Sequence, residues 1–401
     1  MNQEVQIKNL VRDGASESLA GLRGLTSGIK DKTLHIAFVM EIGLGHTTFY
    51  KNLRSVVENH TDIQATWIEI RFDNPGLIFR LPKLRNDIVL RAGVQTYQKL
   101  RDATRKQQFD AIYFHTQLPA VLSHSFMRRI PSVVSIDSTP KQFLALGKHY
   151  GLTDNPRSFL QRRNESWYDR VFNTSAAVFC WSQWAADSVV QDYGLPASRT
   201  QVFQPGVDLS TWVPSHGTQG EEVKLLFVGG DFFRKGGDLL LRWMRECAPP
   251  WCSLDVVTRD TVPDTPRVRV HHDIQPNSDV LKALYRGADL FVFPTFADVA
   301  GLVLTEAMAS GLPVLTTGIA AIPELVTSKT GSVQPAGLIP PEHWEALEQK
   351  LTHLVHDKSR LRAMGQAARA HAELQFDGTR NLLAELDALK QIASRSQIHT
   401  G

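Results

Sequence analysis

The stretch "DVAGLVLTEAMASGLPVL", Asp298 to Leu315, is the part of the chain that decides its fold. It follows the apolar run "ADLFVFP" (288–294), whose length and composition are typical of a buried strand. The stretch opens with two acids, Asp298 and Glu306, and ends in a second apolar run at 312–317. Strand, glycine-containing loop, short helix and strand together predict one unit of a parallel α/β sheet.

The same alternation of apolar runs and helical stretches extends over most of the 401-residue chain. The length suits two domains. Continuous apolar strands between helices predict parallel sheets covered on both faces. We therefore predict an α/β fold of two Rossmann-like, doubly wound domains that face a central cleft. The strand-like runs lie at 34–40, 65–70, 110–115, 131–136, 176–181, 222–230, 252–258, 267–272, 288–294 and 312–317.

Breaks in the pattern suggest domain boundaries. Pro205, Gly206 and Pro214 interrupt regular structure. We predict an N-terminal extension (1–32), an N-terminal domain (33–206), a C-terminal domain (207–375) and a terminal helical segment (376–401).

Composition narrows the function. The net charge of +3 is too small to argue for a nucleic-acid partner. The three cysteines form no CxxC pair, which predicts reduced thiols in a cytoplasmic setting, without a disulfide framework or a zinc site. No apolar run is long enough to span a membrane, and the first residues lack the apolar core of a signal peptide.

The loop "MEIGLGHTTFY" (40–50) follows the first strand, where ligands bind in such sheets. Gly43 and Gly45 allow close approach of the backbone, and a helix that begins near His46 would direct N–H groups at an anion. A dinucleotide fingerprint would need a glycine at Thr48, which disfavours hydride transfer. A plain tight turn remains the alternative for His46.

Two further strand ends carry polar residues. His115 ends one strand and is expected to face the cleft, although a lone histidine is often only a structural hydrogen-bonding group. Asp137 follows another strand, where it either faces the same opening or forms an Asx turn. We keep both as candidate catalytic residues.

The segment "FVGGDFFRKGGDLLL" (227–241) combines glycines with Arg234 and Lys235 ahead of a helix. This pattern predicts an anion site suited to a diphosphate, although a solvated cation pair is the alternative.

Asp298 and Glu306 belong to a second predicted binding segment, the loop and helix that follow the strand at 288–294. Amides near 301–303 could bind phosphate, and an acid one or two helical turns further could bind adjacent ribose hydroxyls. Otherwise Asp298 would be an ordinary N-cap.

In their order and spacing these motifs resemble the large group-one family of retaining, sugar-nucleotide-dependent glycosyltransferases with the GT-B fold. The resemblance covers most of residues 34–396. It rests on "DVAGLVLTEAMASGLPV", which resembles the E-x7-E segment, on the "RKG" turn, and on "QPGVDLSTWVP" at the domain seam.

The resemblance implies roles for individual residues. Glu306 would bind the ribose hydroxyls, and Asp298, the third candidate catalytic residue, would contact the donor sugar. The other predicted donor-binding residues are Gly45, His46, Arg234, Lys235, Gly301 and Leu302. The reaction would transfer a sugar to an acceptor hydroxyl with retention of configuration. The terminal helix would cross back onto the N-terminal domain. No metal-ligand cluster appears and no cofactor is expected, although the diphosphate could recruit magnesium.

This sequence departs from the family pattern in three places. Asp298 is shorter than the usual glutamate, and Asp137 stands where several relatives have histidine. Gly230 stands where many relatives have an arginine, a loss for which Arg234 could compensate. A sugar-nucleotide epimerase of the same architecture and a non-catalytic nucleotide-sugar-binding homologue therefore remain alternatives.

Residues 77–106 carry eight cations against two acids, interleaved with large apolar residues. This composition suits an anionic membrane surface. The basic segment therefore predicts peripheral association with the inner face of a membrane. The family resemblance agrees, because several relatives act on lipid-linked acceptors. The alternatives are a solvated helix packed on the N-terminal domain and attraction of an anionic soluble acceptor.

Overall fold

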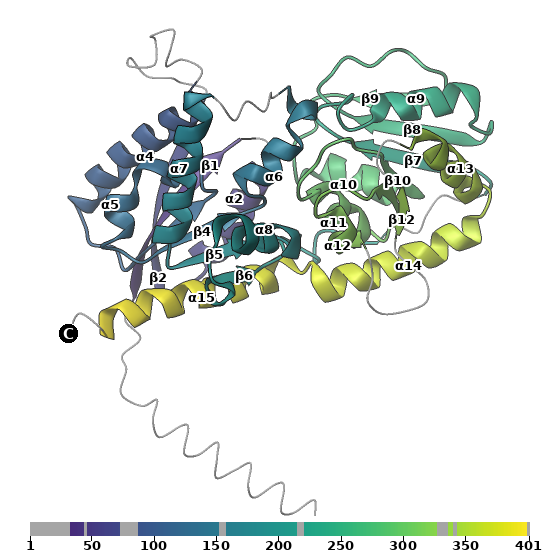
Figure 1. The fold of residues 1–401 in the computed structure, drawn as a ribbon. Helices are drawn as coiled ribbons and strands as arrows, with labels where there is room; N and C mark the ends of the chain where they lie inside the picture. Colours follow the sequence, from purple (N-terminus) through teal and green to yellow (C-terminus); the bar gives the residue numbers. More distant parts are fainter. Residues whose placement is uncertain are drawn as a thin grey trace, which may run out of the picture.

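The computed structural model describes residues 33–43, 46–72, 87–151, 158–214, 220–326, 336–339 and 343–398. The chain forms two lobes, each with a parallel six-stranded sheet and covering helices (Figure 1). The predicted fold of two doubly wound α/β domains is confirmed.

The N-terminal sheet has the strand order β2-β1-β3-β4-β5-β6. Its strands are β1 (Leu34–Ile42), β2 (Ile63–Arg71), β3 (Ala111–His115), β4 (Ser132–Ile136), β5 (Ala177–Cys180) and β6 (Thr200–Val202). Its helices are α2 (His46–Glu58), α4 (Ile88–Thr104), α5 (His124–Met127), α6 (Pro140–Ala145), α7 (Phe159–Thr174) and α8 (Gln183–Tyr193), with short 3-10 turns η2 (Pro119–Leu122), η3 (Gly147–Tyr150) and η4 (Ala197–Arg199).

The C-terminal sheet has the strand order β12-β11-β10-β7-β8-β9. Its strands are β7 (Val223–Val228), β8 (Cys252–Val257), β9 (Val268–His271), β10 (Leu290–Phe293), β11 (Val314–Thr317) and β12 (Ala336–Ile339). The helices of this half are α9 (Gly237–Glu246), α10 (Asp279–Arg286), α11 (Leu302–Ala309), α12 (Ile322–Val326), α13 (Trp344–Val355) and α14 (Lys358–Gln375); α15 (Gly378–Ile398) follows.

Each sheet contains a topological switch point, where successive connections leave in opposite directions. In the N-terminal sheet the switch lies between β1 and β3, and in the C-terminal sheet between β7 and β10. Ligands of open parallel sheets bind outside the carboxyl ends of the strands at such points. The topology therefore singles out the loops after β1, β3, β7 and β10.

Burial explains why the strands read as continuous apolar runs. Every residue of β3, β4, β5 and β10 is buried. Helices cover both faces of each sheet, so neither face can carry the polar alternation of a half-exposed sheet.

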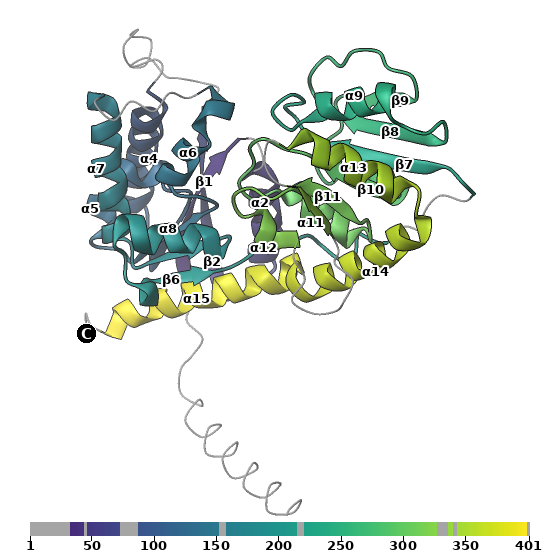
Figure 2. The ribbon, with the colours of Figure 1, turned by 45° about the vertical axis from the view of Figure 1, so that its right-hand side comes forward.

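The last two helices lie along one side of the molecule, α14 under the C-terminal lobe and α15 under the N-terminal lobe (Figure 2). Leu382, Leu386 and Leu389 recur at helical spacing and belong to the same buried cluster as Phe38 and Tyr113 of the N-terminal sheet. The chain thus returns from the second domain to the first and buries an apolar stripe there.

Two edge strands were not predicted from the sequence. β6 has only three residues, two of them Thr and Gln, and β12 has four residues that begin Ala-Gly. Neither has the β-branched or aromatic run on which the prediction of the other strands depends.

Candidate functional site

The loops after β7 and β10 pack directly against each other at the switch point of the C-terminal sheet. Gly236 has a φ of 74°, and a β-carbon there would lie 2.2 Å from the carbonyl oxygen of Pro294. The backbone N–H of Phe296 donates to the carbonyl of Arg234 over 3.0 Å. Only glycine satisfies both the left-handed backbone and this close approach. The predicted "RKG" turn is therefore joined to the segment that leads to Asp298.

Lys235 and Asp298 form a buried ion pair in this joined region. Lys235 Nζ lies 2.5 Å from Asp298 Oδ2 and 3.0 Å from the carbonyl oxygen of Ala297. Burial lowers the pKa of Lys235, against the attraction of Asp298. Burial would raise the pKa of Asp298, but Lys235 and the N–H of Gly301 hold it below its usual value. The Asp298 carboxylate is thus charged at neutral pH.

Arg234 is fixed by an acid and by the opposite domain. Its Nε lies 2.9 Å from Asp231 Oδ2, and its Nη1 donates to the carbonyl of Ala297 over 2.7 Å. Its guanidinium also lies 4.4 Å from the ring centroid of Tyr150 in η3. Burial, and next Asp298, raise the pKa of Tyr150 to about 12, so its phenol stays neutral beside the cation.

The N-termini of two helices, α9 and α11, follow directly on the loops that carry Lys235 and Asp298. α9 and α11 both begin after a left-handed glycine, Gly236 and Gly301, and neither has a side-chain cap. Their first N–H groups and the positive ends of their dipoles suit an anion. The alternative of an ordinary N-cap at Asp298 is wrong, because Gly301 is the N-cap residue. Asp298 Oδ1 instead accepts from the Gly301 N–H over 3.2 Å.

Glu306 lies in the second turn of α11 and is buried. Tyr285 donates its hydroxyl hydrogen to Glu306 Oε2 over 2.9 Å. Burial raises the pKa of Glu306 to about 7, although the Tyr285 hydrogen bond opposes the shift. Sequence reasoning identified this acid but not Tyr285, because no local pattern links α10 to α11.

The N-terminal switch point carries a cluster of rings. His115 lies 4.9 Å from His46, 4.8 Å from Phe49 and 5.7 Å from Trp181, measured between ring centroids. The imidazole of His115 has no exposed surface, and burial, then His46, hold its pKa well below the usual range. The expectation that His115 opens toward the cleft is therefore wrong, since aromatic neighbours enclose the ring. Its catalytic assignment stays a prediction.

His46 and Asp137 lie at the strand ends, as the sequence places them. His46 begins α2, and its N–H donates to the carbonyl of Gly43 over 3.0 Å. Asp137 follows β4 and accepts from the Ser138 hydroxyl over 3.2 Å. The adjacent Gly45 lies outside the described residues, as do residues 77–86 of the basic segment.

Glu41 is a polar residue of this region that the sequence did not reveal. It accepts a hydrogen bond from Thr116, which has an unusual φ of 66°. Burial raises the pKa of Glu41, while His46 and Thr116 oppose the shift and Asp137 adds to it. The sequence placed Glu41 in the loop after the first strand, whereas in the structure it belongs to β1, and the pairing of β1 with β3 brings it to Thr116.

The two switch points belong to one region where the domains meet. Ala300 and Leu302 pack against the N-terminal cluster that contains Phe49 and Trp181. His149 of η3 stacks on Phe296 with ring centroids 5.9 Å apart. The structure thus brings Arg234, Lys235, Asp298, Gly301, Leu302 and Glu306 together in the C-terminal domain, opposite the loops of the N-terminal domain.

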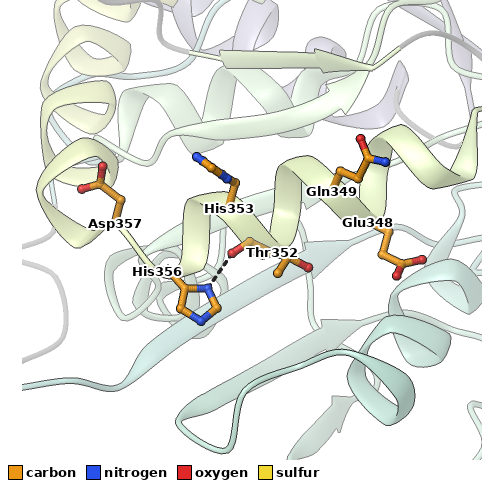
Figure 3. Close-up of a pocket in the computed structure, with 6 residues that line it drawn as sticks. All are labelled: Glu348, Gln349, Thr352, His353, His356 and Asp357. Atoms are coloured by element: carbon orange, nitrogen blue, oxygen red, sulfur yellow. Dashed lines mark hydrogen bonds between the residues drawn. The ribbon is translucent and has the colours of Figure 1, made fainter.

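Other features of the described residues do not compete with this region. They include no group of His, Cys, Asp or Glu that could hold a metal ion. None of their helices is long and apolar enough to cross a bilayer. A surface hollow lies along α13, where His356 Nδ1 is 2.7 Å from the carbonyl oxygen of Thr352 (Figure 3). It contains none of the predicted site residues.

Two Rossmann-like domains whose switch points meet where the domains face each other define a protein of the GT-B class. Two family profiles match the chain: "Glycosyltransferase Family 4" at residues 35–211 and "Glycosyl transferases group 1" at residues 267–371. The chain belongs to the group-one glycosyltransferases, and its predicted membership of this family is confirmed.

Relatives agree with this family. The chain is 25% identical to D-inositol 3-phosphate glycosyltransferase of Paenarthrobacter aurescens over 341 residues, which is 79% of this chain and 81% of that protein. It is 27% identical to alpha-maltose-1-phosphate synthase of Mycolicibacterium smegmatis over 243 residues, 53% of this chain and 62% of that protein.

Solved structures share the fold. Sucrose-phosphate synthase from Thermosynechococcus elongatus has a TM-score of 0.71 at 16% identity. The match covers 90% of this chain and 100% of the synthase chain. HepE of Anabaena, solved in complex with UDP and glucose, has a TM-score of 0.61 at 17% identity, covering 89% and 100%.

Proposed function

We propose that this glycosyltransferase moves a sugar from a nucleoside-diphosphate sugar to an acceptor hydroxyl with retention of anomeric configuration. The observation that carries the proposal is the joined pair of loops after β7 and β10. There Lys235, Arg234 and the uncapped N-termini of α9 and α11 surround one position. These groups are cationic or N–H donors, which is what a diphosphate requires.

Each site residue then has a role consistent with its contacts. Lys235 and the helix N-termini would stabilise the negative charge that develops on the leaving diphosphate. Glu306 accepts a hydrogen bond from Tyr285 through Oε2, and its Oε1 has no partner among the described residues. That oxygen is suited to the ribose hydroxyls. Asp298 would hold Lys235 in place and contact the donor sugar.

The proposal gives the N-terminal domain the acceptor side. His46, His115 and Asp137 lie on that domain, across from the donor loops. The structural relative HepE is described in complexes with UDP and with UDP-glucose, which supports a nucleotide-sugar donor. No resident cofactor forms part of the proposal, and any magnesium ion would enter with the diphosphate.

A donor screen tests the proposal. The protein is incubated with radiolabelled UDP-, GDP- and ADP-sugars, and the products are separated. Slow release of free sugar with retained configuration supports a transferase. A changed sugar on an intact nucleotide would indicate an epimerase, and binding without turnover would indicate a non-catalytic homologue.

Two variants test the site itself. Lys235→Ala and Glu306→Ala should each weaken donor binding about tenfold to a hundredfold, because each removes a charge-assisted contact. Calorimetric titration measures the affinity, and thermal unfolding checks that both variants fold. Unchanged affinity in both would remove the pocket assignment.

A further inference from the structure

The end of β7 is bracketed by two cations from different loops. A β-carbon at Gly229 would lie 3.1 Å from Lys235 Cγ. A β-carbon at Gly230 would lie 2.9 Å from Arg259 Nη2, 3.1 Å from its Nε and 3.3 Å from its Cζ. The guanidinium of Arg259, two residues beyond the end of β8, therefore occupies the space that a side chain at position 230 would fill.

Arg259 differs from the other cations here in having no acid partner. Lys235 is paired with Asp298, and Arg234 with Asp231. The guanidinium of Arg259 has no hydrogen bond or ion pair in the described part of the chain, and its side chain is exposed. The neighbouring Asp260 is directed elsewhere, since its Oδ2 accepts from the N–H of Phe232 over 2.7 Å.

The charge balance shows why an unpaired cation matters. The carboxylates of Asp231 and Asp298 neutralise the two cations that the sequence singled out. An incoming diphosphate must therefore share those cations with the acids or meet further positive charge. A guanidinium has five N–H donors in a planar fork that matches phosphate oxygens. Arg259 presents this fork beside the glycines that open the Lys235 loop.

We propose that Arg259 is the third cation of the donor site and binds the diphosphate of the nucleotide sugar. The inference rests on the proposed function and adds a residue that the sequence did not predict. In this chain the guanidinium comes from the β8 loop, and glycine at 230 leaves the room for it.

Calorimetric titration with UDP, GDP and ADP tests the proposal, with the matching nucleosides as phosphate-free probes. Arg259→Gln should weaken binding of the preferred nucleoside diphosphate about tenfold or more, because one charge-assisted contact is lost. Its affinity for the nucleoside should not change. Arg269→Gln is the matched control, an exposed arginine on the neighbouring strand β9.

The position of the guanidinium is tested separately. In Gly230→Ala the new β-carbon would lie 2.9 Å from Arg259 Nη2, so the guanidinium must shift, and diphosphate binding should weaken by less than in Arg259→Gln. The double variant should bind no more weakly than Arg259→Gln alone. Gly230→Arg combined with Arg259→Gln should recover most of the affinity. Additive losses in the double variant would overturn the proposed contact.

The outcomes separate this inference from the proposed function. If Lys235→Ala weakens diphosphate binding and Arg259→Gln does not, the Arg259 assignment is wrong and the donor site stands. If the unmodified protein binds none of the three nucleoside diphosphates, both proposals are wrong. Equal losses of nucleoside and diphosphate affinity in Arg259→Gln would indicate a structural role and also overturn the inference.

Discussion

Lys235 and Asp298 depend on each other more than their separate roles suggest. Both side chains are mostly buried, at 11% and 19% exposure, so each charge is stabilised chiefly by the other. Removing one partner of such a pair leaves an uncompensated charge in a poorly solvated place. Arg234 adds to this dependence, because a second cation beside Lys235 lowers the pKa of the lysine further.

We therefore predict that Asp298→Asn changes the pH dependence of donor binding. Without the carboxylate, burial and Arg234 lower the pKa of Lys235, and only the weaker attraction of Asp231 opposes them. The lysine then loses its proton, and the site its diphosphate affinity, at a lower pH than in the unmodified protein. Calorimetric titration of the nucleoside diphosphate between about pH 7 and 10, below the ordinary lysine pKa, measures the shift.

Asp231→Asn is the control for this prediction. It removes the acid partner of Arg234, and an arginine stays protonated throughout that range. Its loss of affinity at high pH should move much less than that of Asp298→Asn, because Asp231 has the smallest effect on the pKa of Lys235. If Asp298→Asn loses diphosphate affinity at the same pH as the unmodified protein, the ion pair does not set the charge of Lys235.

The sequence identified the charged residues of the two donor loops but not the side chains that contact them. Arg234, Lys235, Asp298 and Glu306 stand next to glycines and strand ends, which local patterns reveal. Tyr285, Asp231 as a counter-ion, and Arg259 come close only through the packing of separate loops. His115 shows the reverse error, because a strand-end position does not determine whether rings from other elements cover it.

The terminal helix α15 carries a buried acid into the N-terminal domain. Glu385 Oε1 accepts from the hydroxyl of Tyr113 over 2.7 Å and from that of Ser135 over 3.1 Å. Burial raises the pKa of Glu385 to about 7, although both hydrogen bonds oppose the shift. The sequence pattern of α15 predicted an amphipathic helix. It could not show that one acid lies on the buried side.

This acid should make stability depend on pH. The pKa of Glu385 is raised on folding, so the stabilising contribution of its proton is complete below the unfolded value near 4.5 and is lost as pH rises through about 7. A shift of this size corresponds to about 3 kcal/mol across that window. Glu385→Gln should therefore melt higher than the unmodified protein at pH 8 and close to it at pH 5.

Thermal unfolding at several pH values between about 5 and 8 checks this prediction, a range that spans both pKa values. Glu345→Gln on the exposed side of α13 is the control, and its pH profile should follow that of the unmodified protein. Because Glu306 also has a raised pKa, Glu385→Gln should reduce the pH dependence without abolishing it. If Glu385→Gln has the same dependence of melting temperature on pH as the unmodified protein, ionisation of Glu385 does not destabilise the fold.

The sequence predicted those strands whose position is determined by burial alone. The apolar runs became strands because both faces of each sheet are covered. β6 and β12 were missed because they are short edge strands whose pairing depends on neighbours already in place. The sequence contains no comparable signal for them.

The basic segment 77–106 divides into two parts, of which the structure describes residues 87–106. In the described part, Val89, Ala92 and Leu100 of α4 are buried, and Lys99 Nζ donates to the carbonyl of Glu69 over 2.5 Å. This part packs on the N-terminal domain, as one of the alternatives predicted. We assign a membrane contact to residues 77–86, where large apolar residues alternate with cations; these residues lie outside the described residues.

We predict that the protein sediments with anionic vesicles at low salt and much less with neutral ones. Changing Arg80, Lys83 and Arg85 together to Gln should weaken partitioning on the order of 100-fold, because each cation near an anionic surface contributes about 1 kcal/mol. Arg101→Gln with Arg105→Gln, which changes exposed arginines in the last turn and at the C-cap of α4, is the control with smaller effect. Undiminished sedimentation of the triple variant would exclude 77–86 as the contact.

The two domains are also held together by one carboxylate. Glu324 of α12 accepts from the backbone N–H groups of Gln183 and Trp184, at 2.7 Å and 2.6 Å. These are the first two residues of α8 in the other domain, and Ser182 accepts from the next N–H, that of Ala185, over 3.1 Å. The second domain thus completes the N-terminal cap of a helix in the first, with a negative charge at its positive end.

We predict that Glu324→Ala shifts the molecule toward separated domains. Losing two charge-assisted hydrogen bonds and a favourable dipole contact should cost the closed arrangement about 1–2 kcal/mol, a shift of about 5- to 30-fold in its population. Small-angle X-ray scattering should show a larger radius of gyration without ligand. Saturating donor should reduce the difference, because the proposed donor site lies where the two domains meet. Glu373→Ala is the matched control, since Glu373 pairs with Arg369 over 2.6 Å inside a single helix. A radius of gyration equal to that of the control would show that the Glu324 contact does not hold the domains together, and that the Tyr150–Arg234 and His149–Phe296 contacts suffice.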